Sequence, residues 1–416
     1  MREIKILLAG IGGYGENYVS ALLEPQRPER VAGVRVAGVV DPLPERCGLL
    51  ELITENGIPI YPDLAGFYRN CEADLAVLCT PIQFHVDQAL YCLAQGSHIL
   101  CEKPLCALYQ DALRLFRAEA ASGKTVGIGF QLSFSNAVQA LKEDIRAGAF
   151  GRPKRLKALL MMARGEQYYR RNGWAGRIRT GDGSWVLDSP VSNACAHQLH
   201  NMLYVLGKTR ETSAAPLSIT AELYRAYPRI ENYDTAALRC ITSEGVEILL
   251  YASLALPGGK LGPLCYYEFE NGVVVHEHGN DENFEARFGD GRRKNYGELP
   301  KSDRMQKLWD AIEWARGGPK PACGIAAAMP HLLCCNGAQE SMPEIVNFPE
   351  PMVWITGKAG EAAIAVDGLA DTLLDCYNQA KLPHELGTPW SKPGRTITLS
   401  DYRGYPTGGP VPQNGV

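Results

Sequence analysis

The sequence predicts an α/β protein with two domains, a doubly wound N-terminal domain and a C-terminal α+β domain built on an antiparallel sheet. Three observations support this fold class. The first 130 residues alternate short apolar runs with segments of helical apolar spacing, which is the pattern of a parallel sheet with crossover helices. The later runs alternate apolar and polar residues, as strands exposed on one face do. A length of 416 residues is enough for two or three domains.

The strands of the first domain are expected at short runs rich in Val, Ile and Leu, because the strands of a parallel sheet are buried on both faces. These runs are Ile4–Ala9, Val34–Val40, Leu75–Cys79, Ile99–Cys101 and Thr125–Phe130. The segments between them have apolar residues at helical spacing. These predicted helices are Gly15–Glu24, Arg46–Asn56, Val86–Gln95 and Leu108–Ser122.

The second domain begins where the pattern changes, after Phe130. Its predicted strands are Leu156–Met162, Leu217–Tyr224, Thr235–Ile241, Glu247–Ala252 and Cys265–Glu270. Its predicted helices are Asn136–Ala147, Arg304–Ala315 and Ala326–Glu340. We therefore divide the chain into residues 1–130, 131–386 and 387–416. In the last segment 11 of 30 residues are Gly or Pro, so we expect a tail that forms no core and wraps a surface or is mobile.

Composition and charge exclude several classes of protein. The 42 Lys and Arg residues are balanced by 46 Asp and Glu, so the chain lacks the basic field of a nucleic-acid-binding protein. No apolar stretch is long enough to span a membrane, and the first predicted strand begins at Ile4, so we expect no signal peptide. The 13 cysteines show no C-x-x-C spacing, which disfavours disulfides and zinc ribbons. We expect a soluble cytoplasmic protein with no nucleic-acid or membrane partner.

A glycine-rich segment, GIGGYG at residues 10–15, joins the first predicted strand to the first predicted helix. In this context G-x-G-x-x-G binds a dinucleotide. Gly10 permits the tight turn, Gly12 lets a pyrophosphate approach the backbone, and Gly15 lets the helix pack close to the strand. We expect the whole segment, including Gly13 and Tyr14, to contact the cofactor. The alternative is an ordinary glycine turn.

Asp41 ends the second predicted strand, 26 residues after Gly15. A carboxylate there can accept hydrogen bonds from the adenosine ribose hydroxyls and repel a 2′-phosphate, which favours NAD over NADP. The alternative is that Asp41 only begins the turn at Asp41-Pro42. Arg46 is close enough in the sequence to keep NADP as the second choice of cofactor.

Two further strand ends carry the predicted reacting centre. Thr80, Pro81 and His85 follow one strand, and Glu102 and Lys103 follow the next. Ligands of open α/β sheets bind beyond the carboxyl ends of the strands, so Thr80, Pro81 and Lys103 are expected beside the nicotinamide. An ammonium there can stabilise the alkoxide-like charge that develops as hydride leaves carbon. The alternative is a solvated lysine paired with Glu102.

Together these motifs resemble the Gfo/Idh/MocA oxidoreductases. The resemblance rests on the glycine segment, Asp41, Thr80-Pro81 with His85, the stretch from Gly96 to Pro104 that contains Glu102-Lys103-Pro104, and the change of pattern near Phe130. It covers about residues 1–345. It implies a Rossmann domain that binds NAD through these residues, and a second domain with a large, mainly antiparallel open sheet. In the family such a sheet commonly mediates oligomers, so we expect a homo-oligomer, a dimer or tetramer.

The resemblance also implies a catalytic helix, in which an Asp is followed by a His four residues later and by a glycine ten residues further on. His197 and Gly207 match this spacing, and Asn193 stands where the family has Asp. Positions i and i+4 share one helix face, so we expect a single helix over Asn193–Leu206. Because Asn cannot exchange a proton, acid/base work would depend on His197, assisted by Lys103, with Asn193 orienting the reactants. Alternatively, His197 only packs within the helix.

The segment from Arg164 to Gly183 is rich in Arg, Gly and aromatic residues. Its place just before His197 favours a substrate loop, in which Trp174 stacks on a sugar face and Arg177 binds a hydroxyl or carboxylate. Exposed loop surface is the alternative. His200 is a further substrate candidate, although a structural role is the favoured interpretation.

No metal site is expected. His276 and His278 would share one face of a strand, but the sequence offers no third ligand nearby. His197 and His200 lack the H-E-x-x-H pattern of a zinc site.

These observations predict an NAD-dependent oxidoreductase that moves hydride between nicotinamide and a carbinol carbon of a sugar, sugar acid or cyclitol. Two alternatives stay open. The first is an NAD-dependent glycosidase without net redox, for which the loss of Asp at position 193 leaves room. The second is a non-catalytic nucleotide-binding protein on the same fold.

Overall fold

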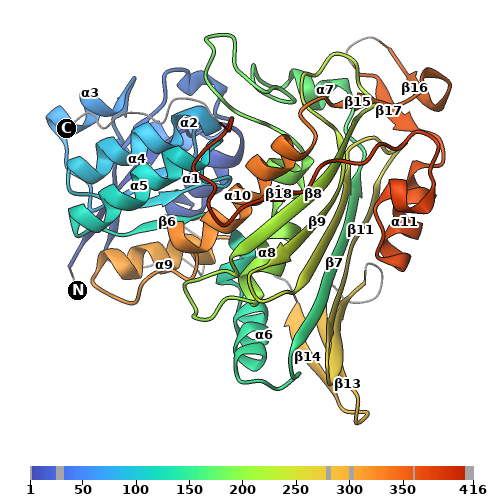
Figure 1. Cartoon of the computed structure of the whole chain (residues 1–416). Helices are drawn as coiled ribbons and strands as arrows, with labels where there is room; N and C mark the ends of the chain where they lie inside the picture. Colours follow the sequence, from blue (N-terminus) through green and yellow to red (C-terminus); the bar gives the residue numbers. More distant parts are fainter. Residues whose placement is uncertain (1, 25–31, 278–282, 299–303, 359–360, 408–416) are drawn as a thin grey trace. The chain divides into compact units, whose positions relative to one another are not determined.

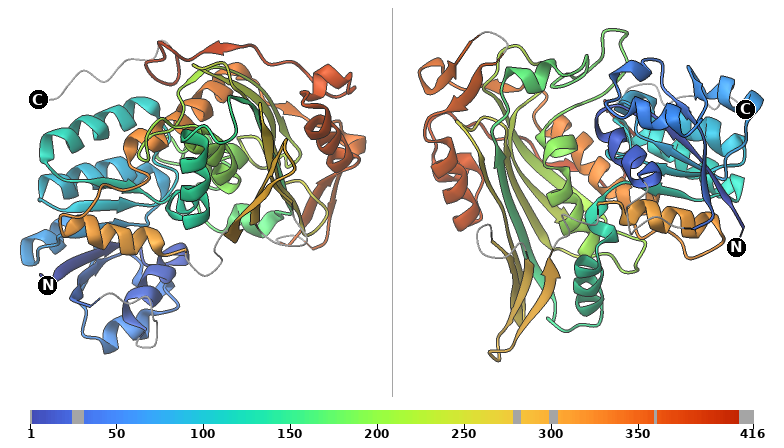
Figure 2. Two further views of the ribbon diagram at one scale, coloured as in Figure 1. Left: turned by 90° about the horizontal axis from the view of Figure 1, so that it is seen from below. Right: turned by 180° about the vertical axis from the view of Figure 1, so that it is seen from behind.

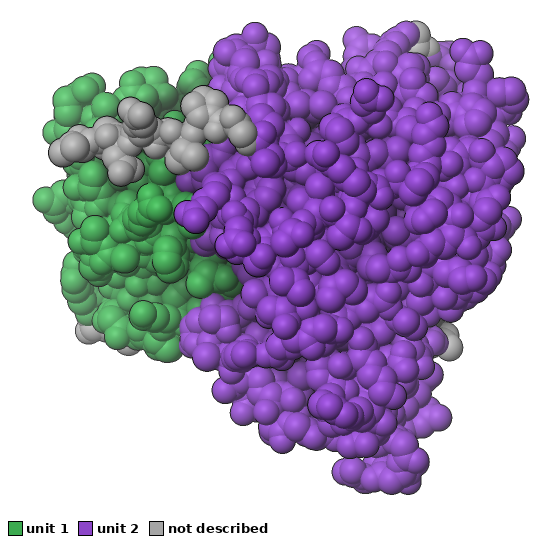
Figure 3. All heavy atoms as spheres, viewed as in Figure 1, with its two compact units in different colours: residues 1–106, 111–135, 300–328 green, residues 107–110, 136–299, 329–416 purple. Residues whose placement is uncertain are grey.

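The computed structural model describes residues 2–24, 32–277, 283–298, 304–358 and 361–407 (Figure 1). The chain divides into two compact units, coloured separately in Figure 3. The first unit consists of Met1–Cys106, Asp111–Ser135 and Pro300–Ala328, and the second of Ala107–Gln110, Asn136–Leu299 and Met329–Val416. The first unit therefore includes a return segment, residues 300–328, that the division made from the sequence assigned to the second domain.

Within the described residues, the first unit contains a six-stranded parallel sheet in the order β3-β2-β1-β4-β5-β6. Its strands are β1 (Ile4–Ala9), β2 (Val34–Val40), β3 (Ile60–Tyr61), β4 (Leu75–Leu78), β5 (His98–Cys101) and β6 (Val126–Ile128). The predicted doubly wound domain is confirmed, and β1 and β2 have the predicted bounds. β3 was not predicted, because two residues give no periodic signal.

Helices connect these strands: α1 (Glu16–Leu23), α2 (Leu50–Glu55), α3 (Leu64–Asn70), α4 (His85–Ala94) and α5 (Tyr109–Ser122). The unpredicted α3 begins after Asp63, whose carboxylate accepts a hydrogen bond from the Gly66 amide at 2.6 Å. The return segment adds α9 (Gln306–Ala315), which contacts β4 and β5. A Cβ on Gly127 would lie only 2.4 Å from the Trp314 ring, so this glycine lets α9 pack closely on β6.

Within the described residues, the second unit contains a ten-stranded sheet in the order β14-β13-β12-β11-β7-β10-β9-β8-β15, with β18 also paired to β8. The strands are β7 (Pro153–Met162), β8 (Pro216–Arg225), β9 (Thr235–Thr242), β10 (Glu247–Ser253), β11 (Lys260–Phe269), β12 (Gly272–His276), β13 (Asn283–Phe288), β14 (Arg293–Glu298), β15 (Val346–Asn347) and β18 (Ile397–Thr398). β7 pairs with β10 and β8 with β15 in parallel, and the other pairs are antiparallel. The predicted mainly antiparallel sheet is confirmed.

Helices cover both faces of this sheet (Figures 1 and 2). They are α6 (Asn136–Arg146), α7 (Glu166–Arg170), α8 (Ala196–Val205), α10 (Ile325–Ser341) and α11 (Leu369–Gln379), accompanied by a hairpin of β16 (Val353–Thr356) and β17 (Ala363–Val366). α8 and α11 contact the same strands, β7 and β10, from opposite sides. The expectation that the central strands are half-exposed is therefore wrong for β10, where six of seven residues are buried. The unpredicted α11 supplies the second cover.

The Gly- and Pro-rich tail contributes to the core, contrary to expectation. Trp390 is 9% exposed, and its ring lies 4.8 Å from that of Tyr224 and 4.9 Å from that of Phe348. Leu399 is also buried, next to β18 at the edge of the sheet. The apolar side chains of Trp390 and Leu399 are enough to pack this Gly- and Pro-rich segment against the sheet, because each removes a large apolar area from water.

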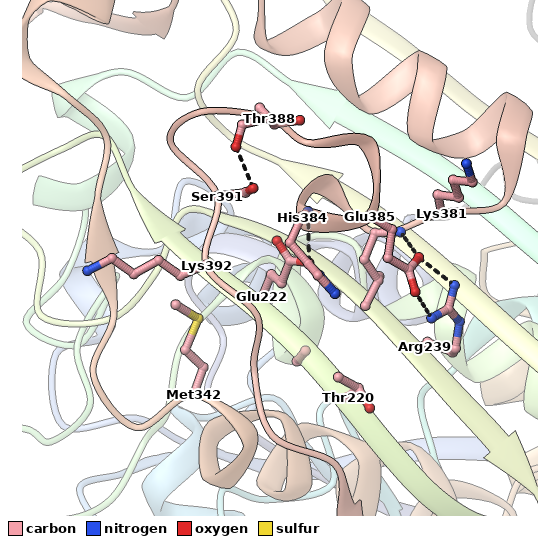
Figure 4. Close-up of polar contacts among 12 residues, drawn as sticks. Thr220, Glu222, Arg239, Met342, Lys381, His384, Glu385, Thr388, Ser391 and Lys392 are labelled. Atoms are coloured by element: carbon pink, nitrogen blue, oxygen red, sulfur yellow. Dashed lines mark hydrogen bonds and ion pairs between the residues drawn. The ribbon is translucent and has the colours of Figure 1, made fainter.

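The segment between α11 and β18 also makes polar contacts with the sheet (Figure 4). His384 Nδ1 lies 2.5 Å from Oε1 of the fully buried Glu222. Burial raises the pKa of Glu222, although hydrogen bonds from Tyr224 and His384 oppose this. Arg239 donates to both carboxylate oxygens of Glu385, at 2.6 and 2.8 Å. Together with Trp390, these contacts attach the segment to β8 and β9.

Candidate active site

The glycine segment forms the turn that the sequence predicts. Gly10 has φ of +80°, and a Cβ there would lie 2.6 Å from the Cys79 carbonyl oxygen. A Cβ on Gly15 would lie 2.1 Å from the Gly10 carbonyl oxygen, so only glycine fits where α1 approaches β1. Around Gly12 the nearest atom to a Cβ is 3.8 Å away, and around Gly13 none lies within 4 Å. One side of the loop is therefore open, as a pyrophosphate site at a helix N-terminus requires.

Asp41 forms the turn that sequence reasoning offered as one alternative, and it also contacts the glycine segment. Its Oδ1 accepts a hydrogen bond from the Leu43 amide at 2.9 Å, which closes the turn after β2. Its Oδ2 accepts a hydrogen bond from the Ile11 amide at 3.0 Å, which ties the turn to the glycine segment. A carboxylate oxygen can accept more than one hydrogen bond. Asp41 can therefore hold the loop and still bind ribose hydroxyls.

His85 lies inside the first unit, 1% exposed. Its Nε2 is 2.8 Å from the Thr80 carbonyl oxygen and its Nδ1 is 2.9 Å from that of Pro104. Burial lowers the pKa of His85, even though both carbonyl groups favour protonation. The sequence placed His85 among the cofactor contacts. The structure instead uses the imidazole to join the loops that follow β4 and β5.

Glu102 is also buried, 7% exposed, rather than turned toward solvent. Its Oε1 accepts hydrogen bonds from Tyr18 at 2.5 Å and from the Lys307 ammonium, and its Oε2 accepts one from the Lys103 amide at 3.1 Å. Burial alone would raise the pKa of Glu102, but the Lys307 charge and these donors hold it below its usual value. The carboxylate expected to touch the cofactor is instead bound by Tyr18, Lys307 and the backbone of Lys103.

Lys307 is a site residue that sequence reasoning missed. It lies on α9, and its ammonium reaches both Glu102 and the hydroxyl of Tyr14, the latter at 3.2 Å. Glu102 keeps the pKa of Lys307 raised despite burial. Tyr14 also donates to Gln131 at 3.3 Å, so the glycine segment is anchored at its tip. The sequence did contain a signal for Lys307. It precedes Ala311 by four residues and Trp314 by seven, which places a lysine on the apolar face of a predicted helix.

Lys103 and Thr80 lie at neighbouring strand ends, as predicted. Lys103 follows β5, Thr80 follows β4, and these strands are paired from Leu75 to Leu78. The Thr80 hydroxyl donates to Gln88 at 2.6 Å. The Lys103 side chain is partly exposed, while its backbone is fixed by Glu102. This arrangement presents a cation at the carboxyl edge of the sheet, where ligands of such folds bind.

In the second unit, the predicted single helix over Asn193–Leu206 is wrong. Residues Pro190–Ala194 form a π-helical turn, closed by a 2.7 Å hydrogen bond from the Cys195 amide to the Pro190 carbonyl oxygen, and α8 starts only at Ala196. Ser189 caps the turn by accepting a hydrogen bond from the Ser192 amide at 3.1 Å. Asn193 and His197 therefore lie on two consecutive helical segments. Both are partly exposed, whereas Cys195 and Ala196 are buried.

Asp188 is the second site residue that sequence reasoning missed. It is 2% exposed, and its Oδ1 accepts a 2.8 Å hydrogen bond from the Asn193 side-chain amide. Its Oδ2 accepts a 2.7 Å hydrogen bond from the Gly176 amide in the predicted substrate loop. The sequence signal was weak, because an Asp before Ser-Pro is also typical of an ordinary helix start.

The predicted substrate residues differ in their surroundings. Arg177 is about half exposed and pairs with Glu231 at 2.7 Å, so a substrate carboxylate would compete with this partner. Trp174 is partly exposed, and its backbone amide donates to Asn172 at 3.1 Å. His200 is fully buried, and its ring stacks on that of Tyr204 at 5.7 Å. Burial lowers the pKa of His200 well below its usual value. This position favours the structural role for His200.

Among the described residues, no group of three or more His, Cys, Asp and Glu side chains could hold a metal ion. His276 is buried, with Nδ1 3.2 Å from the Asn283 carbonyl oxygen, and His278 lies outside the described residues. No helix in the described ranges is long and apolar enough to cross a membrane.

Residues 4–130 match the model of the Gfo/Idh/MocA oxidoreductase family with an NAD-binding Rossmann fold. The chain is 32% identical over 154 residues to inositol 2-dehydrogenase 1 of Mycolicibacterium vanbaalenii, covering 37% of this chain and 43% of that protein. The chain thus spans less than half the length of this relative. A longer match, 24% identical over 377 residues, links 83% of this chain to 97% of inositol 2-dehydrogenase 1 of Saccharopolyspora erythraea.

Solved structures share the fold of both units. The WlbA dehydrogenase of Bordetella pertussis in complex with NADH and UDP-GlcNAcA matches with a TM-score of 0.66 at 19% identity, over 82% of this chain and 97% of that chain. An oxidoreductase of Agrobacterium radiobacter in complex with NAD+, L-tartaric acid and magnesium matches with a TM-score of 0.65 at 18% identity, over the same shares of the two chains. At this identity the matches establish fold alone.

Proposed function

We propose, from the membership of residues 4–130 in the Gfo/Idh/MocA oxidoreductase family, that this chain is an NAD-dependent oxidoreductase. Its substrate would be a sugar, sugar acid or cyclitol with an oxidisable hydroxyl group. The observation that supports this most is the combination of an open glycine turn with a fixed lysine at the neighbouring strand ends. A pure nucleotide-binding protein needs the first feature but not the second.

The described residues fit a bound dinucleotide. Gly12 leaves room for a pyrophosphate over the turn, and Asp41 has acceptor capacity for ribose hydroxyls. Its negative charge disfavours a 2′-phosphate, which supports NAD over NADP. When bound, the nicotinamide would supply the hydride acceptor or donor.

The chain's own groups would handle charge and protons. Lys103 would donate a hydrogen bond to the reacting oxygen and stabilise negative charge on it. His197 would take the hydroxyl proton in the oxidising direction and return it in the reducing direction, as imidazole groups do in general acid-base catalysis. Asn193 would orient the same hydroxyl. Glu102, His85 and Lys307 would act indirectly, by fixing the backbone that carries Lys103.

The relatives support the substrate class without defining the compound. Inositol is a cyclitol, and the ligands named with the matched structures include a nucleotide sugar acid and a hydroxy acid. All carry a secondary hydroxyl beside other polar groups. A homo-oligomer, as the family resemblance implies, remains part of the proposal.

The test follows nicotinamide absorbance while polyols, sugars and sugar acids are offered with NAD or NADP. Lys103→Ala should lower kcat/KM on the best compound by about 100-fold, because one donor to the developing oxyanion is lost, while the Kd for NAD stays within about threefold. Lys154→Ala, at an exposed lysine of the second unit, is the control and should change neither. Turnover of Lys103→Ala within severalfold of the parent would disprove the role. Release of free sugar without NADH accumulation would favour the redox-neutral glycosidase instead.

A further inference from the structure

Asp188 is a buried carboxylate that contacts Asn193, one of the candidate catalytic residues. Its carboxylate is 2% exposed and is shared between the Asn193 side chain, at 2.8 Å, and the Gly176 amide, at 2.7 Å. Removing a carboxylate from water is costly unless hydrogen bonds compensate it. Packing alone would be served better by an apolar side chain. The carboxylate therefore has a purpose that depends on its charge or its acceptors.

The backbone around Asp188 is strained and firmly held. Leu187, immediately before it, has φ of 46°, in the left-handed region that side chains other than Gly rarely adopt. Such conformations cluster at functional sites, where the surrounding structure enforces them. Here the Asp188 amide donates to the Arg177 carbonyl oxygen at 2.9 Å. The Asp188 carbonyl oxygen accepts from the Asn232 side chain at 3.0 Å.

This arrangement fixes how Asn193 is oriented. A carboxylate can only accept, so the amide group of Asn193 that faces Asp188 must be the NH2 group. The Asn193 oxygen then points away from Asp188 and is presented as an acceptor. The π-helical turn over Pro190–Ala194 sets the distance between the two residues, since both ends of the turn are anchored by Ser189 and Cys195.

We propose that Asp188 is a positioning residue, which holds the Asn193 amide so that its oxygen accepts a hydrogen bond from a substrate hydroxyl. Through Gly176, the same carboxylate links Asn193 to the substrate loop. The inference depends on the proposed function, because it concerns how a hydroxyl-bearing substrate is oriented. In this arrangement the negative charge of Asp188 would not contact the substrate hydroxyl directly, because the Asn193 side chain lies between them.

The experiment compares Asp188→Asn, Asn193→Asp and the exchanged pair Asp188→Asn with Asn193→Asp. Asp188→Asn should lower kcat by about 100-fold with little change in KM or in the Kd for NAD, because a misplaced orienting group costs about this factor. Asn193→Asp brings two carboxylates together, so its activity should survive only at low pH, where one of them is protonated. The exchanged pair should recover to within about tenfold of the parent. Asp375→Asn, at an exposed aspartate of α11, which carries no residue of the proposed site, should behave like the parent.

A structural role alone predicts a different result. Asp188→Asn would then lower the melting temperature, and the exchanged pair would restore neither kcat nor the parent pH profile. That outcome would overturn the proposal.

If the parent turns over none of the offered compounds, the proposed function fails, yet the contact between Asp188 and Asn193 can still be tested by thermal unfolding. As pH rises from about 5 to 8, the melting temperature of Asn193→Asp should fall further than that of the parent, since the folded-state pKa of the paired carboxyls is raised. A melting-temperature difference between Asn193→Asp and the parent that does not change with pH would refute the positioning contact.

Discussion

Glu102 and Lys307 form an ion pair inside the first unit, although 205 positions separate them in the chain. Both side chains are almost fully buried, at 9% and 0% exposure. The pair connects the loop after β5, which contains Lys103, to α9 of the return segment, and Lys307 also contacts Tyr14 in the glycine segment. The loop that would hold the cofactor and the backbone that carries Lys103 therefore share one buried support.

Breaking this pair should destabilise the first unit. Lys307→Met removes the ammonium that is hydrogen-bonded to Glu102 and leaves a buried carboxylate without its main countercharge. We expect a loss of about 3 to 5 kcal/mol in the free energy of unfolding, measured by urea denaturation. The double variant Glu102→Gln with Lys307→Met should lose less than Lys307→Met alone. A single variant as stable as the parent would contradict the importance of the pair.

Asp41 should set the choice between NAD and NADP. The parent should bind NAD at least about tenfold more tightly than NADP, equivalent to about 1.4 kcal/mol. Asp41→Asn removes the charge that repels a 2′-phosphate, so the ratio of the two Kd values should move toward one. Asp63→Asn, which alters a helix cap elsewhere in the same unit, should leave the ratio unchanged. Equal ratios in the parent and Asp41→Asn, measured by calorimetry, would refute this role.

Asp234 should make stability depend on pH. Burial raises its pKa to about 6, despite hydrogen bonds from the Ala226 and Tyr227 amides at 2.8 and 2.9 Å. A raised folded-state pKa means that the folded protein binds more protons than the unfolded chain between about pH 4 and 6. This contribution to stability is present below that window and is lost as pH rises through it, by up to roughly 3 kcal/mol. Asp234→Asn should remove the dependence. An unchanged pH profile of unfolding in Asp234→Asn would disprove the assignment.

The first unit was largely predictable because its signals are local. Mainly apolar runs of three to seven residues mark β1, β2, β4 and β5, and the glycine spacing fixes the turn before α1. β3 and α3 escaped prediction, since a two-residue strand and a seven-residue helix give little periodicity. In the second unit β7 to β11 were predicted, whereas β12, β13 and β14 were not. The helix α11 was not predicted either, and so the burial of β10 on both faces was missed.

The site was predictable only where residues are neighbours in the sequence. The positions of Gly10, Gly15 and Lys103 follow from strand ends and turn geometry. The partners of Glu102 and Asn193 could not be predicted in this way. Lys307, which binds Glu102, belongs to a distant segment, and Asp188 and Asn193 are separated by a π-helical turn. A helix pattern assumes a repeat of 3.6 residues, and a single π turn shifts every contact across it. A buried ion pair between distant segments produces no hydrophobic periodicity in the sequence from which it could be predicted.

The most direct measurement is calorimetric titration of NAD into the parent, Gly12→Ala and Gly15→Ala, together with the melting temperature of each. Gly12 has an extended backbone and room for a Cβ, so Gly12→Ala should keep the parent melting temperature. It should bind NAD at least about tenfold more weakly, since the methyl group occupies the pyrophosphate position. Gly15→Ala should lose stability as well, because its Cβ collides with the Gly10 carbonyl oxygen. A parent that does not bind NAD, or a Gly12→Ala variant that binds it as tightly as the parent, would contradict a dinucleotide site at this turn.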